Sequence, residues 1–177
     1  MQVQPTNTHI TIRIYVADLA AYNAGHLHGV WIDATDDADA IREQIAGMLA
    51  ISPMPGAEEY AIHDSEGFGA YAVSEHEGIE QLHDVACFIE EFPDYGAELL
   101  DHFGDLEQAR EAATENYGGC YPSLADYAQE LTEETDQIPP SLVCYIDYER
   151  MARDMELSGD VFTVKAASHE VHVFWNR

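Results

Sequence analysis

This 177-residue sequence has few basic residues. It contains seven Lys and Arg, of which Lys165 is the only lysine, against 34 Asp and Glu, and its formal net charge is -27. Because DNA, RNA and anionic membrane surfaces are themselves polyanions, we do not expect this chain to bind nucleic acid or a membrane directly. Its charge favours cations and basic protein surfaces as partners.

Cysteine is scarce, and long apolar runs are absent. Cys87, Cys120 and Cys144 are widely spaced and include no C-x-x-C pair, which indicates neither a zinc site nor a disulfide framework. No stretch approaches the ~20 apolar residues of a membrane-spanning helix, and the first nine residues contain no basic or apolar run. We therefore expect buried free thiols and a soluble, cytoplasmic protein.

Signatures of catalysis and of metal binding are also missing. The sequence has no H-E-x-x-H, G-x-S-x-G, P-loop or dinucleotide fingerprint, and Ser141 and Cys144 have no adjacent His and Asp to activate them. Glu80 and His83 form one Glu-x-x-His, whereas a dinuclear bundle site needs two. The remaining histidine pairs lack a third ligand: His26 with His28, and His169 with His172. We therefore predict no catalytic residue, no metal and no cofactor.

Enough apolar material is present for a folded core. Hydrophobic residues make up 46% of the chain, and 18 residues are aromatic. Disordered chains combine high net charge with few aromatic residues, so this composition predicts folded protein. The length allows one domain or two to three small ones.

The acidity is concentrated in the middle of the chain. Residues 43–136 contain 23 Asp and Glu and a single basic residue, Arg110, so this segment carries -22 of the total charge. Residues 1–32 are neutral and residues 137–177 carry only -2. Any proposed function has to explain why a folded chain carries so much negative charge in one segment.

Several ordinary explanations of the acidity remain open. Acidic helix faces are often merely solvated, and a halophilic protein also has many acids and few lysines, although its ends should then be as acidic as its middle. Calcium binding is disfavoured, because Asp37 and Asp39 lack the glycine and the twelfth-position glutamate of a calcium loop.

The first third of the chain predicts a small α+β unit. Apolar and polar residues alternate over residues 10–16, which is typical of a half-buried strand. Further strands are predicted at residues 28–33 and 59–64. Between them, Thr35 and Asp36 offer N-caps for a helix that ends before Pro53.

The middle of the chain predicts helices alone. Ser74 and Glu77 form a capping-box pattern, and an apolar stripe follows at helical spacing: Ile79, Leu82, Ala86, Ile89 and Phe92. A short helix is predicted around Leu99 to Phe103. Asp105 is expected to cap another, which has Tyr117 on its inner side and ends at Gly118-Gly119.

The last third predicts a second α+β unit. Ser123 is expected to cap a helix, and a further helix is predicted over residues 141–155, with Leu142 and Tyr145 among its inner positions. Gly159 is a plausible C-terminal cap. Alternation over residues 161–164 and 171–175 predicts a hairpin that turns at residues 166–169.

The predicted helix after Ser74 carries an acidic row opposite its apolar stripe. The row is spaced by three, four and seven residues: Glu77, Glu80, Asp84 and Glu91. Like charges four residues apart cost a few tenths of a kcal/mol each, and an ordinary solvated helix would interleave Lys or Arg. Carboxylates ~5 Å apart along a helix approach the ~3.4 Å spacing of charges on one strand of a duplex.

Four long segments resemble the ArdA antirestriction proteins of conjugative plasmids and transposons: residues 20–34 (AAYNAGHLHGVWIDA), 58–64 (EEYAIHD), 99–119 (LLDHFGDLEQAREAATENYGG) and 138–162 (IPPSLVCYIDYERMARDMELSGDVF). The resemblance extends in order from about Ile10 to the C-terminus. It implies a DNA mimic that binds the methyltransferase core of type I restriction–modification enzymes. There the mimic would occupy the groove that normally binds DNA.

The resemblance also implies a fold and an assembly. The expected fold is an elongated α+β chain of three small domains, residues 1–73 (α+β), 74–117 (helical) and 118–177 (α+β), with a homodimer formed by the last. The apolar surface of the dimer interface is expected to be formed by Val161, Phe162, Val171, Val173, Phe174 and Trp175. A dimer would carry -54, the charge on roughly 90 Å of duplex.

We expect the mimicry to rest on many carboxylates and not on one site. The core candidates are Glu77, Glu80, Asp84, Glu90, Glu91, Asp94, Glu98, Asp101, Asp105, Glu107, Glu111 and Glu115. The segment 126–136, similar to the family's antirestriction motif, would extend them with Asp126, Glu130, Glu133 and Glu134.

Two other functional classes remain open at this point. One is an enzyme or metal-binding regulator that uses the histidines. The other is an acidic interaction module for a different basic DNA-binding protein, such as a histone-like factor.

Overall fold

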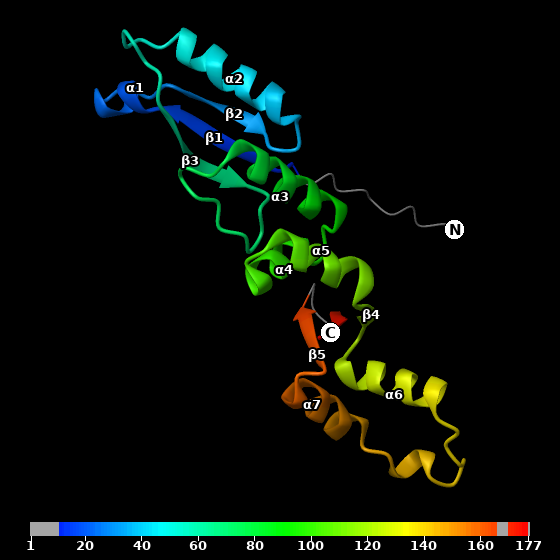
Figure 1. The fold of residues 1–177 in the computed structure, drawn as a ribbon. Helices are drawn as coiled ribbons and strands as arrows, with labels where there is room; N and C mark the ends of the chain where they lie inside the picture. The colour runs from blue at the N-terminus through cyan, green and yellow to red at the C-terminus, as the bar shows by residue number, and fades with distance from the viewer. Residues whose placement is uncertain (1–10, 166–169, 177) are drawn as a thin grey trace, which may run out of the picture. The chain divides into compact units, whose positions relative to one another are not determined.

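The computed structural model describes residues 11–165 and 170–176, which divide between Ala97 and Glu98 into two compact units, hereafter the first and the second unit (Figure 1). Both units combine helices with a small antiparallel sheet, so the predicted α+β class is confirmed. The expected division into three domains is not confirmed. The Ile10 end of the first predicted strand and the hairpin turn at 166–169 lie outside the described residues.

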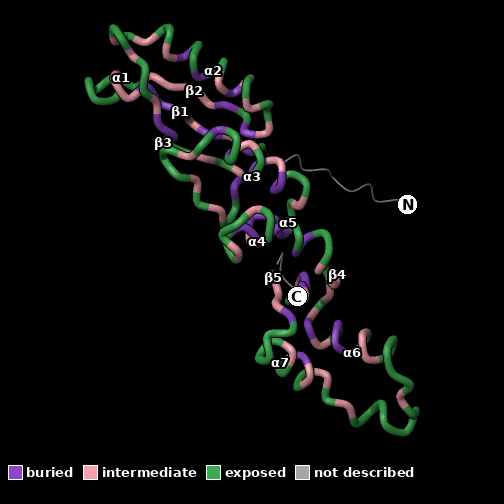
Figure 2. The backbone as a smooth tube through the Cα atoms, viewed as in Figure 1, coloured by how far each residue is buried: buried purple, intermediate pink, exposed green. Residues whose placement is uncertain are grey.

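The first unit is built on a three-stranded sheet. Its elements are β1 (Arg13–Asp18), α1 (Leu19–Asn23), β2 (Gly29–Asp33), α2 (Ala38–Ala50), β3 (Tyr60–Glu66) and α3 (Ile79–Glu91). The strand order is β2-β1-β3, and both pairings are antiparallel. The predicted alternation is confirmed, because Ile12, Ile14 and Val16 are buried while Arg13 and Tyr15 are partly exposed. Figure 2 shows buried and intermediate stretches along β1.

Two local predictions in this unit need correction. Residues 19–23 form the short helix α1, which the strand pattern did not indicate. The N-cap of α2 is Asp37, whose side chain accepts a hydrogen bond from the Asp39 N–H, and not Thr35 or Asp36. Thr35 is instead held in a turn by hydrogen bonds from its N–H and hydroxyl to Asp33.

Asp18, at the end of β1, is a buried carboxylate of this unit. It accepts hydrogen bonds from the N–H groups of Ala20 (2.9 Å) and Ala21 (3.1 Å) and from the Ser52 hydroxyl. Burial by itself would raise the pKa of this carboxyl, but the hydrogen bonds and nearby His28 outweigh burial and lower the pKa. Asp18 therefore stays ionised and ties α1 to the residues after α2.

The apolar stripe of α3 is confirmed, but the predicted helix start is wrong. Ile79, Leu82, Ala86 and Ile89 are buried. The helix begins at Ile79 with Gly78 as its N-cap.

The Ser74–Glu77 pattern forms a separate turn before α3. The Glu77 side chain accepts hydrogen bonds from the Ser74 N–H (2.8 Å) and from the Tyr71 hydroxyl. Half of a capping box therefore forms here, because the Glu77 carboxylate reaches back to Ser74, but the chain does not continue as a helix.

A strand follows α4 (Gly96–Phe103) and α5 (Leu106–Glu115), where the sequence predicted the end of a helix. Asp105 caps α5 as predicted, accepting a hydrogen bond from the Gln108 N–H. Tyr117 is exposed and begins β4 (Tyr117–Tyr121), so its assignment to an inner helix face is wrong. Pairing with β6 explains the difference, since Gly119 takes a φ of 119° where the register shifts.

The second unit packs helical residues against both faces of its sheet, since His102 and Phe103 of α4 contact Phe162, while the preceding residue, Val161, lies in the core on the other face. Strands β4, β5 (Val161–Lys165) and β6 (Val171–Trp175) lie in the order β4-β6-β5, and the predicted pairing of the last two is confirmed. α6 (Leu124–Thr135), capped by Ser123 as predicted, and α7 (Tyr148–Ser158) cover it. Their shared core consists of Leu124, Tyr127, Ala128, Ala152, Val161 and Val173.

The start of the helix predicted over residues 141–155 is wrong, whereas its second half is confirmed. A short 3-10 turn at Val143–Tyr145 is followed by α7, which begins only at Tyr148. Asp147 sets this start, because its side chain accepts a hydrogen bond from the Arg150 N–H (2.9 Å). Gly159 ends α7 in the left-handed conformation (φ 77°), as predicted.

We predict that Asp18→Asn lowers the free energy of unfolding of the first unit by about 2 kcal/mol at neutral pH, because it weakens an ionised acceptor of three hydrogen bonds. The folded-state pKa lies below the unfolded value of ~3.9, so this stabilisation is present above about pH 4 and is lost as the pH falls further. Urea unfolding between about pH 7 and pH 2 should show the two proteins converging. The exposed Asp84→Asn variant is the control, and a constant difference over this range would contradict the prediction.

Candidate acidic binding surface

The predicted acidic residues lie at the surface. All sixteen are exposed except Glu77 and Glu98, which are partly exposed. They occur on α3, α4, α5 and α6 and in the segments between these helices. Each unit therefore contributes carboxylates that solvent, or a partner, can reach.

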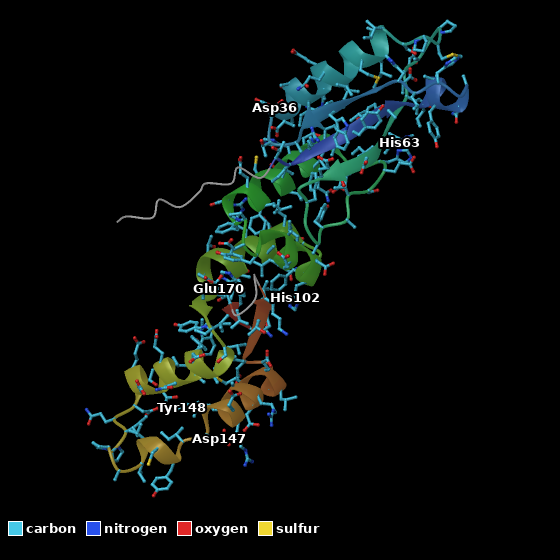
Figure 3. All side chains as sticks on the ribbon, turned by 180° about the vertical axis from the view of Figure 1, so that it is seen from behind. Asp36, His63, His102, Asp147, Tyr148 and Glu170 are labelled. Carbon is cyan, nitrogen blue, oxygen red and sulfur yellow. The ribbon has the colours of Figure 1, made fainter. Side chains whose placement is uncertain are left out.

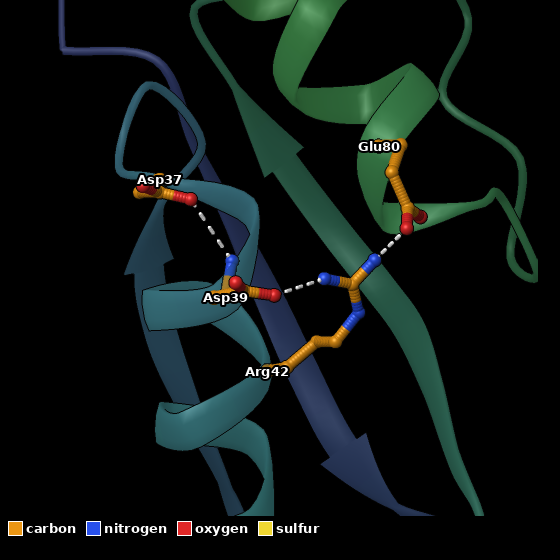
Figure 4. Close-up of polar contacts among 4 residues, drawn as sticks. All are labelled: Asp37, Asp39, Arg42 and Glu80. Carbon is orange, nitrogen blue, oxygen red and sulfur yellow. Dashed lines mark hydrogen bonds and ion pairs between the residues drawn. The ribbon is translucent and has the colours of Figure 1, made fainter.

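One candidate, Glu80, is already paired with a cation. Arg42 on α2 contacts Asp39 on its own helix (2.7 Å) and Glu80 in the first turn of α3 (Figure 4). Arg42 is the last basic residue before Arg110. Its guanidinium links the two helices and neutralises part of the charge at the start of α3, so Glu80 contributes less to a free acidic face than the sequence suggested.

The α3 row is shorter than predicted. Glu77 precedes the helix and is occupied by Ser74 and Tyr71. Asp84 is exposed, and no hydrogen bond or ion pair engages it within the described part of the chain. Glu90 and Glu91 are exposed at the end of the helix.

The most regular row lies on α5. Glu107, Glu111 and Glu115 are four residues apart and exposed, and the opposite side of the helix is buried: Ala109, Ala112 and Ala113. Successive carboxylates are therefore ~6 Å apart along the helix axis. Among the described residues, none of the three forms a hydrogen bond or ion pair. Asp105, just before them, caps the helix instead.

The acidic residues of α6 include one that holds a tyrosine. The Tyr121 hydroxyl donates a hydrogen bond to Glu130 Oε1 (3.0 Å). Partial burial, together with this hydrogen bond and the charge of Glu130, raises the pKa of Tyr121 to about 12. Glu133 accepts a hydrogen bond from Gln129 (2.8 Å), and Glu134 is exposed.

The predicted dimer residues divide into two groups. Val161, Val173 and Phe174 are buried inside the second unit, whereas Phe162, Val171 and Trp175 are only partly buried. β6 is the central strand, so both of its edges are hydrogen-bonded within the sheet. The first group is thus occupied in packing the unit itself, and the dimer contact stays a prediction.

Sequence reasoning missed an exposed apolar segment between α6 and α7. Leu142 is 51% exposed and Tyr145 is 81% exposed, so their predicted inner positions are wrong. Backbone hydrogen bonds hold the turn, from the Leu142 N–H to the Pro139 carbonyl (2.8 Å) and from the Tyr145 N–H to the Leu142 carbonyl (2.9 Å). Figure 2 shows this segment as a largely exposed stretch. The Pro139-Pro140 pair was the available signal, because it interrupts the helical pattern.

A cavity of about 580 Å³ lies beside this segment, between the first turns of α6 and α7. Asp147 and Tyr148, at the start of α7, are among its lining residues (Figure 3), with Asp126, Cys144 and Glu149. No histidine lines it. Cys144 is exposed, as is Cys120, so the expectation of buried thiols is wrong for these two cysteines. Within the described residues, no three His, Cys, Asp or Glu side chains are grouped to hold a metal ion.

None of the helices within residues 11–165 and 170–176 combines the length and apolar character that crossing a bilayer requires.

Residues 14–170, which are most of the chain, match the family described as Antirestriction protein (ArdA). No curated protein matches the sequence.

We predict that Glu130→Gln moves the titration of Tyr121 from about pH 12 toward ~10, the ordinary value for tyrosine. The substitution removes the negative charge that disfavours the phenolate, while partial burial of Tyr121 remains. Carbon-13 labelled tyrosine rings followed by NMR during an alkaline titration would resolve this residue. Glu133→Gln on the same helix is the control and should leave Tyr121 unchanged; an equal shift in both variants would contradict the assignment.

Proposed function

Because the chain belongs to the ArdA family of antirestriction proteins, whose members are inhibitors, we propose that it acts as a DNA mimic. It occupies the DNA-binding groove of a type I restriction–modification enzyme and competes there with DNA. Inhibition is steric and electrostatic, and no covalent chemistry is required.

The observation that carries this proposal is the set of exposed carboxylates on successive helices, in a segment with one basic residue among 94. A helix face selected only for solubility would include Lys or Arg, because like charges one turn apart are destabilising. A surface selected to meet Lys and Arg side chains would exclude them. On α5, Glu107, Glu111 and Glu115 have no hydrogen bond or ion pair within the described residues, and the same helix carries Arg110, the one basic residue of the segment.

The mechanism follows from how proteins bind DNA. Much of that affinity comes from Lys and Arg contacts to phosphates, which do not depend on base sequence. Carboxylates at comparable spacing would engage the same side chains, so enzymes with different recognition sequences would be inhibited. Opposite charges on the two surfaces make association fast and strongly salt-dependent.

The alternative is an acidic module for another basic DNA-binding protein. Competition of the chain and a DNA duplex for a type I methyltransferase core separates the two. Mutual exclusion, with one dimer bound per core, supports the proposed function. Simultaneous binding of DNA and the chain would refute it.

The proposed active species is a homodimer formed by the second unit. Large exposed apolar groups on a soluble protein commonly mark an interface, and Leu142, Val143 and Tyr145 supply such a group here. Phe162, Val171 and Trp175, which are only partly buried, remain further candidates. The resemblance of residues 138–162 to the family supports a role for this segment.

We predict that substituting the whole α5 row, Glu107→Gln, Glu111→Gln and Glu115→Gln together, weakens binding to the methyltransferase core at least ~10-fold. The slope of log K against log salt should fall by about 2, because each lost phosphate-like contact contributes ~0.7–0.9. Fluorescence anisotropy with labelled DNA as competitor measures both quantities.

A charge-matched control tests position against total charge. The triple variant Glu58→Gln, Glu59→Gln and Asp64→Asn removes three exposed acids that lie outside the candidate set. It should bind nearly as well as the native chain, and the single Asp84→Asn variant should lose less than ~3-fold. Equal losses in the two triple variants would show that only net charge matters.

We predict that Leu142→Ser combined with Tyr145→Ser converts the dimer to monomer without unfolding, because both side chains are exposed within the unit. Sedimentation equilibrium at micromolar concentration would show the change. Leu157→Ser, which removes a leucine that is 78% exposed on α7, is the matched control. A native chain that is monomeric, or a dimer that survives the double substitution, would contradict this interface.

A further inference from the structure

An open groove of about 510 Å³ runs along α7 in the second unit, outside the acidic rows described above. Its apolar lining is formed by Ile146, Met151 and Met155. Met151 and Met155 are one helical turn apart and only partly buried, and they pack against the core of the unit. The apolar floor of the groove therefore consists of flexible, polarisable methionine side chains that are anchored on a helix.

Carboxylates surround this apolar floor. Asp147, Asp154 and Asp160 line the groove together with a single cation, Arg150. Asp147 uses one oxygen to accept the Arg150 N–H, and Asp160 uses one to accept the Ser158 hydroxyl (2.6 Å). Asp154 is exposed, and no hydrogen bond or ion pair is recorded for it within the described residues. The groove thus combines an apolar base with a net negative rim.

We propose that this groove binds a basic, amphipathic segment of the target protein. An apolar side chain of that segment lies on Met151 and Met155, and a neighbouring Lys or Arg meets Asp154. The inference rests on the proposed function and specifies the kind of protein surface recognised. Charge complementarity selects this occupant, because a second copy of the chain would bring further carboxylates against the rim.

The groove adds selectivity among basic proteins, which carboxylate rows that imitate phosphates do not provide. Carboxylate rows match any basic DNA-binding surface, so alone they discriminate poorly among such surfaces. An apolar contact requires a complementary side chain on the partner and is not weakened by salt as exposed charge pairs are. The groove is therefore a determinant of which basic protein is bound.

Methionine methyl groups provide the test in the full chain. Besides Met1, the chain has Met48 and Met54 in the first unit and Met151 and Met155 in the groove. The probe is a 16-residue helical peptide with Lys and Leu at i, i+4 spacing, compared with a peptide that has Ser in place of Leu and the same charge. In 0.3 M salt, we expect the first peptide to shift the methyl signals of Met151 and Met155, leaving Met48 and Met54 unchanged.

Substitution of the rim identifies the charge contact. Asp154→Asn should weaken binding of the Lys–Leu peptide by roughly threefold, whereas Glu149→Gln, which removes the same charge from α7 outside the groove, should not. Equal binding of the Ser-containing peptide, unshifted groove methyls, or groove methyls that shift on concentrating the chain alone would each overturn the proposal. The last of these would identify a second copy as the occupant.

The peptide test and the DNA-competition test can fail separately. If the chain and DNA bind the methyltransferase core together while the peptide still occupies the groove, only the proposed function is refuted. If the chain displaces DNA but the groove methyls do not respond to the peptide, only the groove assignment is refuted.

Discussion

Repulsion among exposed carboxylates is the force that the rest of this structure has to withstand. Two like charges ~6 Å apart in water cost about 0.7 kcal/mol before screening by salt, and helix neighbours one turn apart cost a few tenths of a kcal/mol. Burying one large apolar side chain contributes about 1.5–3 kcal/mol. The buried stripe of α3, with Leu82 and Phe88 fully enclosed, can therefore offset the repulsion on the exposed side of the same helix.

The few basic residues and the buried carboxylate Asp18 hold helices and loops together in places where repulsion between acidic side chains would otherwise push them apart. Arg42 joins α2 to α3 through Asp39 and Glu80, so the acidic start of α3 is held against its neighbour. Asp18 remains ionised inside the first unit because donors surround it. Elsewhere the chain uses carboxylates as helix caps, at Asp37, Asp105 and Asp147, so part of its acidity has a structural role.

Hydrophobic periodicity predicted most helices and strands, and it failed where one residue decided a boundary. The stripe of α3 and the alternation in β1 depend on many residues, so they were recognised. The Gly118-Gly119 pair is compatible both with the end of a helix and with a strand, and only the pairing with β6 distinguishes these two structures. Likewise, Asp147 caps the start of α7, whereas the apolar pattern placed the start of this helix at residue 141. The exposure of Tyr145 followed from that boundary and could not be deduced from its apolar character.

Candidate acidic residues were predictable as surface residues, because Asp and Glu are rarely buried without a partner. Their occupancy was not predictable: Glu80, Glu77 and Glu130 already contact Arg42, Tyr71 and Tyr121, while the α5 row does not have such partners among the described residues. This difference matters for mechanism. A carboxylate with an internal partner must exchange that contact for another when the chain binds its target. A carboxylate without a partner gains a contact, and the incoming cation also reduces its repulsion with neighbouring carboxylates. The regular row on α5 therefore has more free energy to gain from a basic groove than the same number of acids that already have internal partners.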